Sequence, residues 1–183
     1  MRRPLFIASL SLALVIALGG GWILSEGPED EYRLDTTAGS IALNKVSEGR
    51  VLASVELLDD DANRVATNTW LGTPLVVNFW FSTCEPCRRE FPVLVAADAK
   101  FDHIRFIGVN ISDTTESARS FLARYNATFD NFFDRDGTLT SAMNVATAPV
   151  TLLIDAGGVV RRQLTGEVTA ETLSLAINEV FPT

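Results

Sequence analysis

Apolar and polar positions divide this chain into a long apolar N-terminal run, a polar stretch, and a region where strand-like and helix-like patterns alternate. The first run, Leu5 to Leu24, contains no charged residue. Its 20 residues are about the length that crosses the hydrocarbon core of a bilayer as a helix. Arg2 and Arg3 on its short leading side favour an orientation that places the rest of the chain outside the cytoplasm.

A cleaved signal peptide is the alternative for this run, with residues 17–19 as a small-residue cleavage site. Ile23 and Leu24 continue the apolar run beyond that site, which favours an uncleaved anchor over residues 1–24. Residues 25–40 are polar and predict a flexible linker, so the folded domain is expected over residues 41–183. We therefore expect a membrane-anchored protein with its domain on the extracytoplasmic face, or a secreted protein if the signal is cleaved.

Beyond residue 40, runs rich in β-branched and aromatic residues predict strands, and apolar positions three and four apart predict helices. The predicted strands are 51–58, 65–67, 75–80, 104–110, 131–134, 150–155 and 159–166, and the predicted helices are 84–99, 114–125, 137–145 and one from residue 170 onward. The first two strands and the last two are expected to form hairpins. This order predicts an α/β domain with a central sheet and helices on both faces.

Three details sharpen this pattern. The run Leu75–Trp80 has no charge, as is typical of a central strand buried on both faces. Asp113 with Glu116 three residues later resembles a capping box and predicts a helix start at that point. Thr169 is expected to cap the last helix.

Composition excludes several classes of function. The formal net charge is −8, which argues against a nucleic-acid partner because a phosphate backbone requires a basic surface. The chain has only two cysteines, Cys84 and Cys87, so there is no disulfide framework. A tetrahedral zinc site needs four ligands, and His103 is the single histidine, so no metal is expected.

Cys84 falls where a buried strand is expected to end and a helix to begin. The first amides of a helix lack partners within the helix and carry partial positive charge, so a thiolate is stabilised there. Pro86 suits a first turn because its missing N–H would be unpaired anyway. Cys87 lies one turn later on the same face, where it can close a disulfide. Cys84 is then expected to attack a substrate disulfide, and Cys87 to resolve the mixed disulfide and release reduced substrate.

Two other interpretations of the cysteine pair are weaker. A static structural disulfide closing so short a loop would stabilise the fold little. A peroxidatic cysteine of the usual peroxiredoxin pattern has Pro seven residues and Thr three residues ahead of it. This chain has Val77 and Phe81 at those two positions.

The stretch VVNFWFSTCEPCRREFP, residues 76–92, resembles the TlpA/ResA group of membrane-tethered, thioredoxin-like thiol–disulfide oxidoreductases. The likeness extends from about Leu52 to the C-terminus and includes TAPVTLLID, residues 147–155. It implies a thioredoxin-like fold with an N-terminal β-hairpin and a central βα insertion, preceded here by one N-terminal transmembrane or signal helix. The chain between Cys87 and Pro149 leaves room for that insertion.

The resemblance also implies roles for single residues. Pro149 matches a cis-proline that packs opposite the disulfide, and the backbone of Ala148 is then expected to pair with an extended substrate segment. Glu90 matches a glutamate close to the cysteine pair; if burial raises its pKa, it can exchange a proton with Cys87. Asn78 stands where cytoplasmic thioredoxins carry a buried acid, which supports giving the proton role to Glu90. A solvated glutamate stabilised by the helix dipole is the alternative.

Three further positions bear on redox direction and partner choice. Glu85 opposes the helix dipole beside Cys84, which makes the dithiol easier to oxidise and favours a reductase. The family commonly has Trp immediately before the first cysteine, where this chain has Thr83, so the choice of partner stays open. Trp80 is expected to pack beneath the active site. Together with Thr83, Ala148 and Pro149 it is a candidate substrate-binding residue.

Together these features predict an extracytoplasmic thiol–disulfide reductase whose only redox group is the Cys84–Cys87 disulfide. The resemblance implies protein disulfides as substrates, among them apocytochrome c before haem attachment, and a membrane thiol protein as electron donor. A general disulfide oxidase or isomerase on the same fold is the first alternative. A non-catalytic module that uses the thioredoxin surface for docking is the second.

Overall fold

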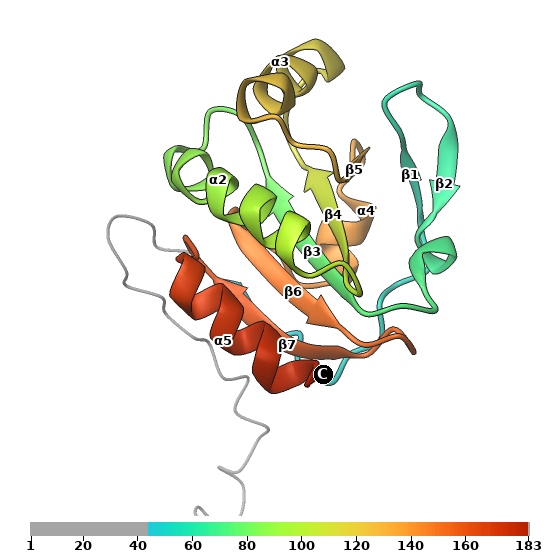
Figure 1. Ribbon diagram of the computed structural model, residues 1–183. Coiled ribbons are helices and arrows are strands. Elements are labelled where there is room, and N and C mark those ends of the chain that lie inside the picture. The colour runs from blue at the N-terminus through green and yellow to red at the C-terminus, as the bar shows by residue number, and fades with distance from the viewer. Residues whose placement is uncertain (1–43, 183) are drawn as a thin grey trace, which may run out of the picture. The chain divides into compact units, whose positions relative to one another are not determined.

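Seven strands form one mixed sheet in the computed structural model, which describes residues 44–182 (Figure 1). The strands are β1 (Glu56–Leu58), β2 (Arg64–Ala66), β3 (Leu75–Trp80), β4 (Arg105–Asn110), β5 (Asp130–Phe133), β6 (Val150–Ile154) and β7 (Val160–Thr165). The helices are η1 (Thr67–Trp70), α2 (Glu85–Lys100), α3 (Thr115–Tyr125), α4 (Thr138–Ala142) and α5 (Ala170–Val180). The predicted order of hairpins, strands and helices is confirmed.

The sheet order is β2-β1-β5-β4-β3-β6-β7, which puts β3 in the interior of the sheet, between β4 and β6. β3 runs parallel to β4 and antiparallel to β6, with Asn78 opposite Gly108 on one side and Thr151 on the other. Every residue of β3 is buried, as its uncharged sequence predicts. The site-bearing end of β3 is therefore held by hydrogen-bonded strands on both sides.

Helices cover both faces of the sheet. Cluster 1 joins Trp80 of β3 to apolar residues of α2, α3 and α5, and Figure 1 shows these three helices on one side of the sheet. Cluster 2 joins Val77 and Phe79, the alternate residues of β3, to Leu139 of α4 and to Trp70 of η1. Successive residues of β3 thus belong alternately to two separate cores, because successive side chains of a strand point to opposite faces of the sheet.

Between α2 and β6 the chain forms two βα units, β4-α3 and β5-α4, which accommodates the predicted central insertion. The β1–β2 hairpin joins the sheet through a single residue pair, Leu58 with Phe133. The fold is the thioredoxin-like α/β arrangement that the sequence predicts.

Two local predictions are wrong. The strand expected over 51–58 is regular only at Glu56–Leu58, and Val51 instead makes an isolated bridge to Val159 beside β7. The residue that caps α3 is Thr114, whose hydroxyl accepts from the Ser117 N–H, and not Asp113. Asp113 has another role, described below.

The predicted anchor (1–24), the linker (25–40) and the start of the domain lie outside the described residues. Within residues 44–182, no helix combines the length and the apolar character that a membrane span requires.

Candidate active site

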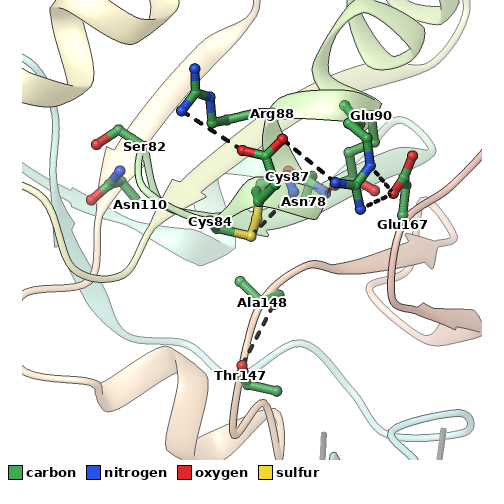
Figure 2. Close-up of a disulfide and its surroundings, with 12 residues drawn as sticks. Asn78, Ser82, Cys84, Cys87, Arg88, Glu90, Asn110, Thr147, Ala148 and Glu167 are labelled. Atoms are coloured by element: carbon green, nitrogen blue, oxygen red, sulfur yellow. Dashed lines mark hydrogen bonds and ion pairs between the residues drawn. A yellow bond between two sulfur atoms is a disulfide. The ribbon is translucent and has the colours of Figure 1, made fainter. Parts of the chain in front are cut away.

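The two cysteines are joined in a disulfide at the start of α2, directly beyond the buried strand β3 (Figure 2). The sulfurs are 2.00 Å apart and the Cα atoms 5.2 Å apart. Cys84 is the N-cap of α2, and its sulfur accepts a hydrogen bond of 3.1 Å from the Cys87 N–H. This is the helix-terminal position that stabilises a thiolate once the disulfide is reduced. Cys84 keeps 4% exposure and Cys87 none, so Cys84 is the sulfur that an incoming disulfide meets first.

A carboxylate fixes the loop that delivers Cys84. Asp113 accepts hydrogen bonds from the Ser82 N–H at 2.6 Å and from the Ser82 hydroxyl at 2.7 Å. Asn110, the last residue of β4, donates to the same carboxylate at 2.6 Å. Because β3 and β4 are parallel neighbours, their carboxyl ends meet at one edge of the sheet, which brings Asp113 to the loop after β3. Sequence reasoning assigned Asp113 to a helix cap and missed this contact.

The segment before β6 forms the opposite wall of the site. The Ala148–Pro149 peptide bond is cis, as the family resemblance implied for Pro149. Both residues are buried, and Ala148 belongs to the same apolar cluster as Cys84 and Cys87. In Figure 2, Ala148 lies across from the disulfide. The structure thus brings the substrate-binding candidates Ala148 and Pro149 to the predicted redox centre.

Glu90 is fully buried on α2, one turn beyond Cys87. Its two carboxylate oxygens accept from different elements: Oε1 from the Asn78 side-chain amide at 2.8 Å and Oε2 from the Val168 N–H at 2.9 Å. The same Asn78 nitrogen donates to the Thr151 hydroxyl at 3.0 Å. The solvated alternative for Glu90 is therefore excluded. Its partners Asn78 and Val168 were not predicted, although Asn78 was singled out as the residue replacing a buried acid.

The surroundings of Glu90 shift its pKa toward neutral pH. Burial raises the pKa of Glu90 from 4.5 to about 7, because a carboxylate loses its hydration. The hydrogen bonds from Val168 and Asn78 work against this rise, since both favour the charged form, and the negative charge of Glu167 adds slightly to it. A carboxyl group with a pKa of about 7 is suited to both accepting and donating a proton at neutral pH.

Two glutamates and two arginines near the disulfide form a chain of ion pairs. Glu85 lies 3.8 Å from Arg88 and 3.6 Å from Arg89, and Arg89 also bonds to Glu167 at 2.7 Å. Glu85 is therefore accompanied by two cations that sequence reasoning did not consider. Their charge opposes the effect of Glu85 on Cys84, so the predicted tilt toward reduction is weaker than Glu85 alone would give.

The remaining predicted residues differ in how far they are exposed. Trp80 is fully buried beneath the site, with its ring 5.1 Å from that of Phe91 and its indole N–H donating to Asn131 at 3.1 Å. Thr83, next to Cys84, is exposed, and Pro86 lies in the first turn of α2. The prediction that Trp80 contacts substrate is wrong, because its side chain packs under the site and has no exposed surface.

Within residues 44–182 there is no group of three or more His, Cys, Asp or Glu side chains that could hold a metal ion.

Residues 49–163 match the AhpC/TSA family. The chain is 27% identical over 139 residues to thiol-disulfide oxidoreductase ResA of Bacillus subtilis, covering 75% of this chain and 78% of ResA. It is 26% identical to ResA of Oceanobacillus iheyensis over 185 residues, which cover 99% of this chain and 91% of that protein.

Solved structures of other proteins are also similar to this chain. A putative thiol:disulfide interchange protein DsbE from Chlorobium tepidum superposes with a TM-score of 0.64 at 28% identity, covering 72% of this chain and 94% of that one. StoA from Bacillus subtilis superposes with a TM-score of 0.58 at 22% identity, covering 68% and 96%, which supports the fold.

Proposed function

This chain belongs to the AhpC/TSA family and, within it, to the TlpA/ResA-like thiol–disulfide oxidoreductases, and from that premise we propose that it reduces protein disulfides outside the cytoplasm. The observation that carries the proposal is the disulfide at the N-terminus of α2, with a buried glutamate one turn further along the same helix. A nucleophile, a resolving thiol and a proton carrier are thereby supplied by one helix.

The proposed reduction proceeds in two thiol–disulfide exchange steps. The Cys84 thiolate attacks a substrate disulfide, forming a mixed disulfide and releasing one substrate thiolate, which takes a proton from solvent. Cys87 passes its proton to the Glu90 carboxylate and attacks the Cys84 sulfur. The second substrate sulfur leaves as a thiolate and takes that proton from Glu90, which restores the Glu90 carboxylate. The enzyme dithiol is oxidised to the disulfide and the substrate disulfide is reduced to two thiols. A second thiol protein must then reduce Cys84–Cys87 to start the next cycle.

The net direction is proposed from Glu85. Its carboxylate lies in the first turn of α2, where it disfavours the Cys84 thiolate and so makes the dithiol a better reductant. Arg88 and Arg89 offset part of this effect. A redox titration against glutathione measures the balance: we expect a potential well below that of DsbA, and a value near −120 mV would identify a disulfide oxidase instead.

The substrate and the cellular setting rest on the resemblance and on the N-terminal sequence. We propose apocytochrome c as a substrate, a membrane thiol protein as electron donor, and attachment of the domain to the outer face of the membrane through residues 1–24. The uncharged run from Leu5 to Leu24 supports the anchor, and its continuation past residue 19 argues against cleavage.

Trapping in cells tests the substrate. In the Cys87→Ala variant the Cys84 mixed disulfide cannot be resolved, so the partner stays attached and can be identified by mass spectrometry. Cytochrome precursors among the trapped proteins are the expected result, and their absence would contradict the cytochrome proposal. The double variant Cys84→Ser/Cys87→Ala is the matched control, because it keeps the fold and removes the attacking sulfur.

A further inference from the structure

The first described residues form an N-terminal strap, residues 44–52, that lies along β7 and across the loop before β6. The Gly49 N–H donates to Val160 at 2.8 Å, the Val160 N–H donates to Arg50 at 2.9 Å, and the Leu52 N–H donates to Gly158 at 2.7 Å. β7 is the last strand of the sheet, so the strap pairs with an otherwise open edge. These bonds fix the position of the strap against the domain.

At its start the strap reaches the wall of the active site. The Asn44 side-chain oxygen accepts from the Ala146 N–H at 2.6 Å and from the Thr147 N–H at 3.0 Å. The Asn44 side-chain nitrogen donates to the Thr147 carbonyl at 3.3 Å. Asn44 is only 3% exposed, and its partners are 102 and 103 residues away in the chain.

Asn44 supplies a hydrogen-bond acceptor for backbone N–H groups that have no backbone partner in the loop before β6. Ala146 and Thr147 lie between α4 and β6, so neither helix nor sheet hydrogen bonds engage their N–H groups. The loop turns at Asn144, which has a φ of 56°, and then runs to Ala148 beside the disulfide. The Asn44 oxygen therefore fixes peptide units 145–146 and 146–147, and its nitrogen holds unit 147–148 through the Thr147 carbonyl. A side chain can substitute in this way for missing backbone partners.

Neighbouring strap residues hold the other end of the same loop. The Ser47 hydroxyl donates to the Met143 carbonyl, and the Arg50 guanidinium donates to the Ala142 carbonyl at 3.0 Å. The loop from Ala142 to Thr147 is thus tied to the strap at both ends. Its position relative to the disulfide depends on a segment from the opposite end of the sequence.

We propose that Asn44 is a positioning residue for substrate recognition: it holds the backbone of residues 146–148 in the place from which Ala148 pairs with an extended peptide substrate. This rests on the proposed disulfide reductase function and extends it to the strap. Asn44 acts through the loop and does not touch the sulfurs, so its loss should weaken binding of substrates that have a peptide backbone. It should leave the chemistry of the dithiol unchanged.

The experiment compares two disulfide substrates, each with saturating dithiothreitol as reductant. One is a peptide with a single intramolecular disulfide flanked by extended residues, and the other is a small aromatic disulfide without a peptide backbone. Asn44→Ala should raise KM for the peptide roughly tenfold, the factor that corresponds to about 1.4 kcal/mol. The kcat for the peptide, both constants for the aromatic disulfide and the redox potential should stay at their wild-type values.

Two further variants make the result specific. Asn44→Asp keeps an oxygen for the Ala146 and Thr147 N–H groups and should restore most of the wild-type KM. Asn63→Ala removes the same amide from the β1–β2 turn, where Asn63 bonds to Asp59 at 3.0 Å, and should change neither substrate.

The outcomes separate the two proposals. An unchanged KM for the peptide in Asn44→Ala, or an equal loss of activity on both substrates, overturns the positioning role. So does an Asn44→Asp variant as impaired as Asn44→Ala. A wild-type protein that reduces neither disulfide refutes the reductase function itself, and the role of Asn44 falls with it.

Discussion

The buried carboxyl of Glu90 makes the stability of the domain depend on pH, and Glu90→Gln should remove that dependence. The substitution suits the site. The fixed Val168 N–H keeps an acceptor if the glutamine oxygen faces it, and the glutamine nitrogen then faces Asn78. Within residues 44–182, the Asn78 side-chain oxygen is buried without a hydrogen-bond partner. A half-turn of the Asn78 amide would let that oxygen accept from the new nitrogen and from the Thr151 hydroxyl.

The size of the effect follows from the pKa of Glu90, which rises from 4.5 to about 7 on folding. Between these values the folded protein holds a proton that the unfolded chain has lost, so stability falls as pH rises. Below pH 4.5 both states are protonated and nothing is lost, and above pH 7 the loss is complete. Each pKa unit is worth about 1.4 kcal/mol, so the total is about 3 kcal/mol.

Urea denaturation of the disulfide form at half-unit steps from pH 4 to pH 8.5 measures this loss. The free energy of unfolding of the wild type should fall relative to that of Glu90→Gln by about 3 kcal/mol across the window, because other titrating groups cancel in the difference. Glu171→Gln removes the same charge from an exposed place in the first turn of α5 and should keep the wild-type profile. Parallel curves for the wild type and Glu90→Gln would refute a buried carboxyl that titrates near neutral pH.

Three other substitutions probe the surroundings of the site. Glu167→Gln removes a negative charge that raises the pKa of Glu90, so NMR titration of the Glu90 carboxyl carbon should show a lower pKa, and an unchanged value would contradict that coupling. Gly108→Ala would place a β-carbon 1.9 Å from the Asn131 side-chain oxygen. It should lower the free energy of unfolding by about 1–3 kcal/mol in urea, and wild-type stability would contradict the close packing. Asp113→Ala frees the loop before the first cysteine and should slow the reaction of the reduced protein with a small disulfide roughly tenfold, as a misplaced nucleophile does. An unchanged rate, measured by stopped flow, would show that the loop holds its place without the carboxylate.

The parts of this protein that follow from sequence are those with local or periodic signals. A short uncharged run rich in β-branched and aromatic residues, such as Leu75–Trp80, is typical of a buried strand, and a Cys-x-x-Cys beyond its end marks the redox centre. Pro86 in the first turn and Thr169 as the cap of α5 follow from the preferences of helix termini. The spacing of Cys84, Cys87 and Glu90 on one helix face was equally visible, because it depends on the helix period alone.

The parts that did not follow depend on contacts between distant segments. Asp113 has the type and spacing of a helix cap, but the neighbouring parallel strand brings the Ser82 amide to it, and Thr114 caps the helix instead. The burial of Glu90 is completed by the Val168 N–H, 78 residues away. Only the end of the strap, Val51 and Leu52, was predicted to belong to a strand, and residues 44–50 carried no prediction. Most hydrogen bonds of the strap go to a loop and a strand more than 90 residues later. No local pattern encodes such pairings.

The sequence distance between the strap and its partners also determines the order in which the parts of the active site can form. Asn44 leaves the ribosome about a hundred residues before Ala146 and Thr147, and the β7 edge that receives Gly49 and Leu52 follows later still. At a synthesis rate of roughly 5–20 residues per second, the partners of the strap are synthesised several seconds after the strap itself. The cysteines can therefore emerge, and even form their disulfide, while the wall that receives a substrate is unfinished. The substrate wall and the buried site of Glu90, which needs the Val168 N–H, are both completed only after the two cysteines have been synthesised.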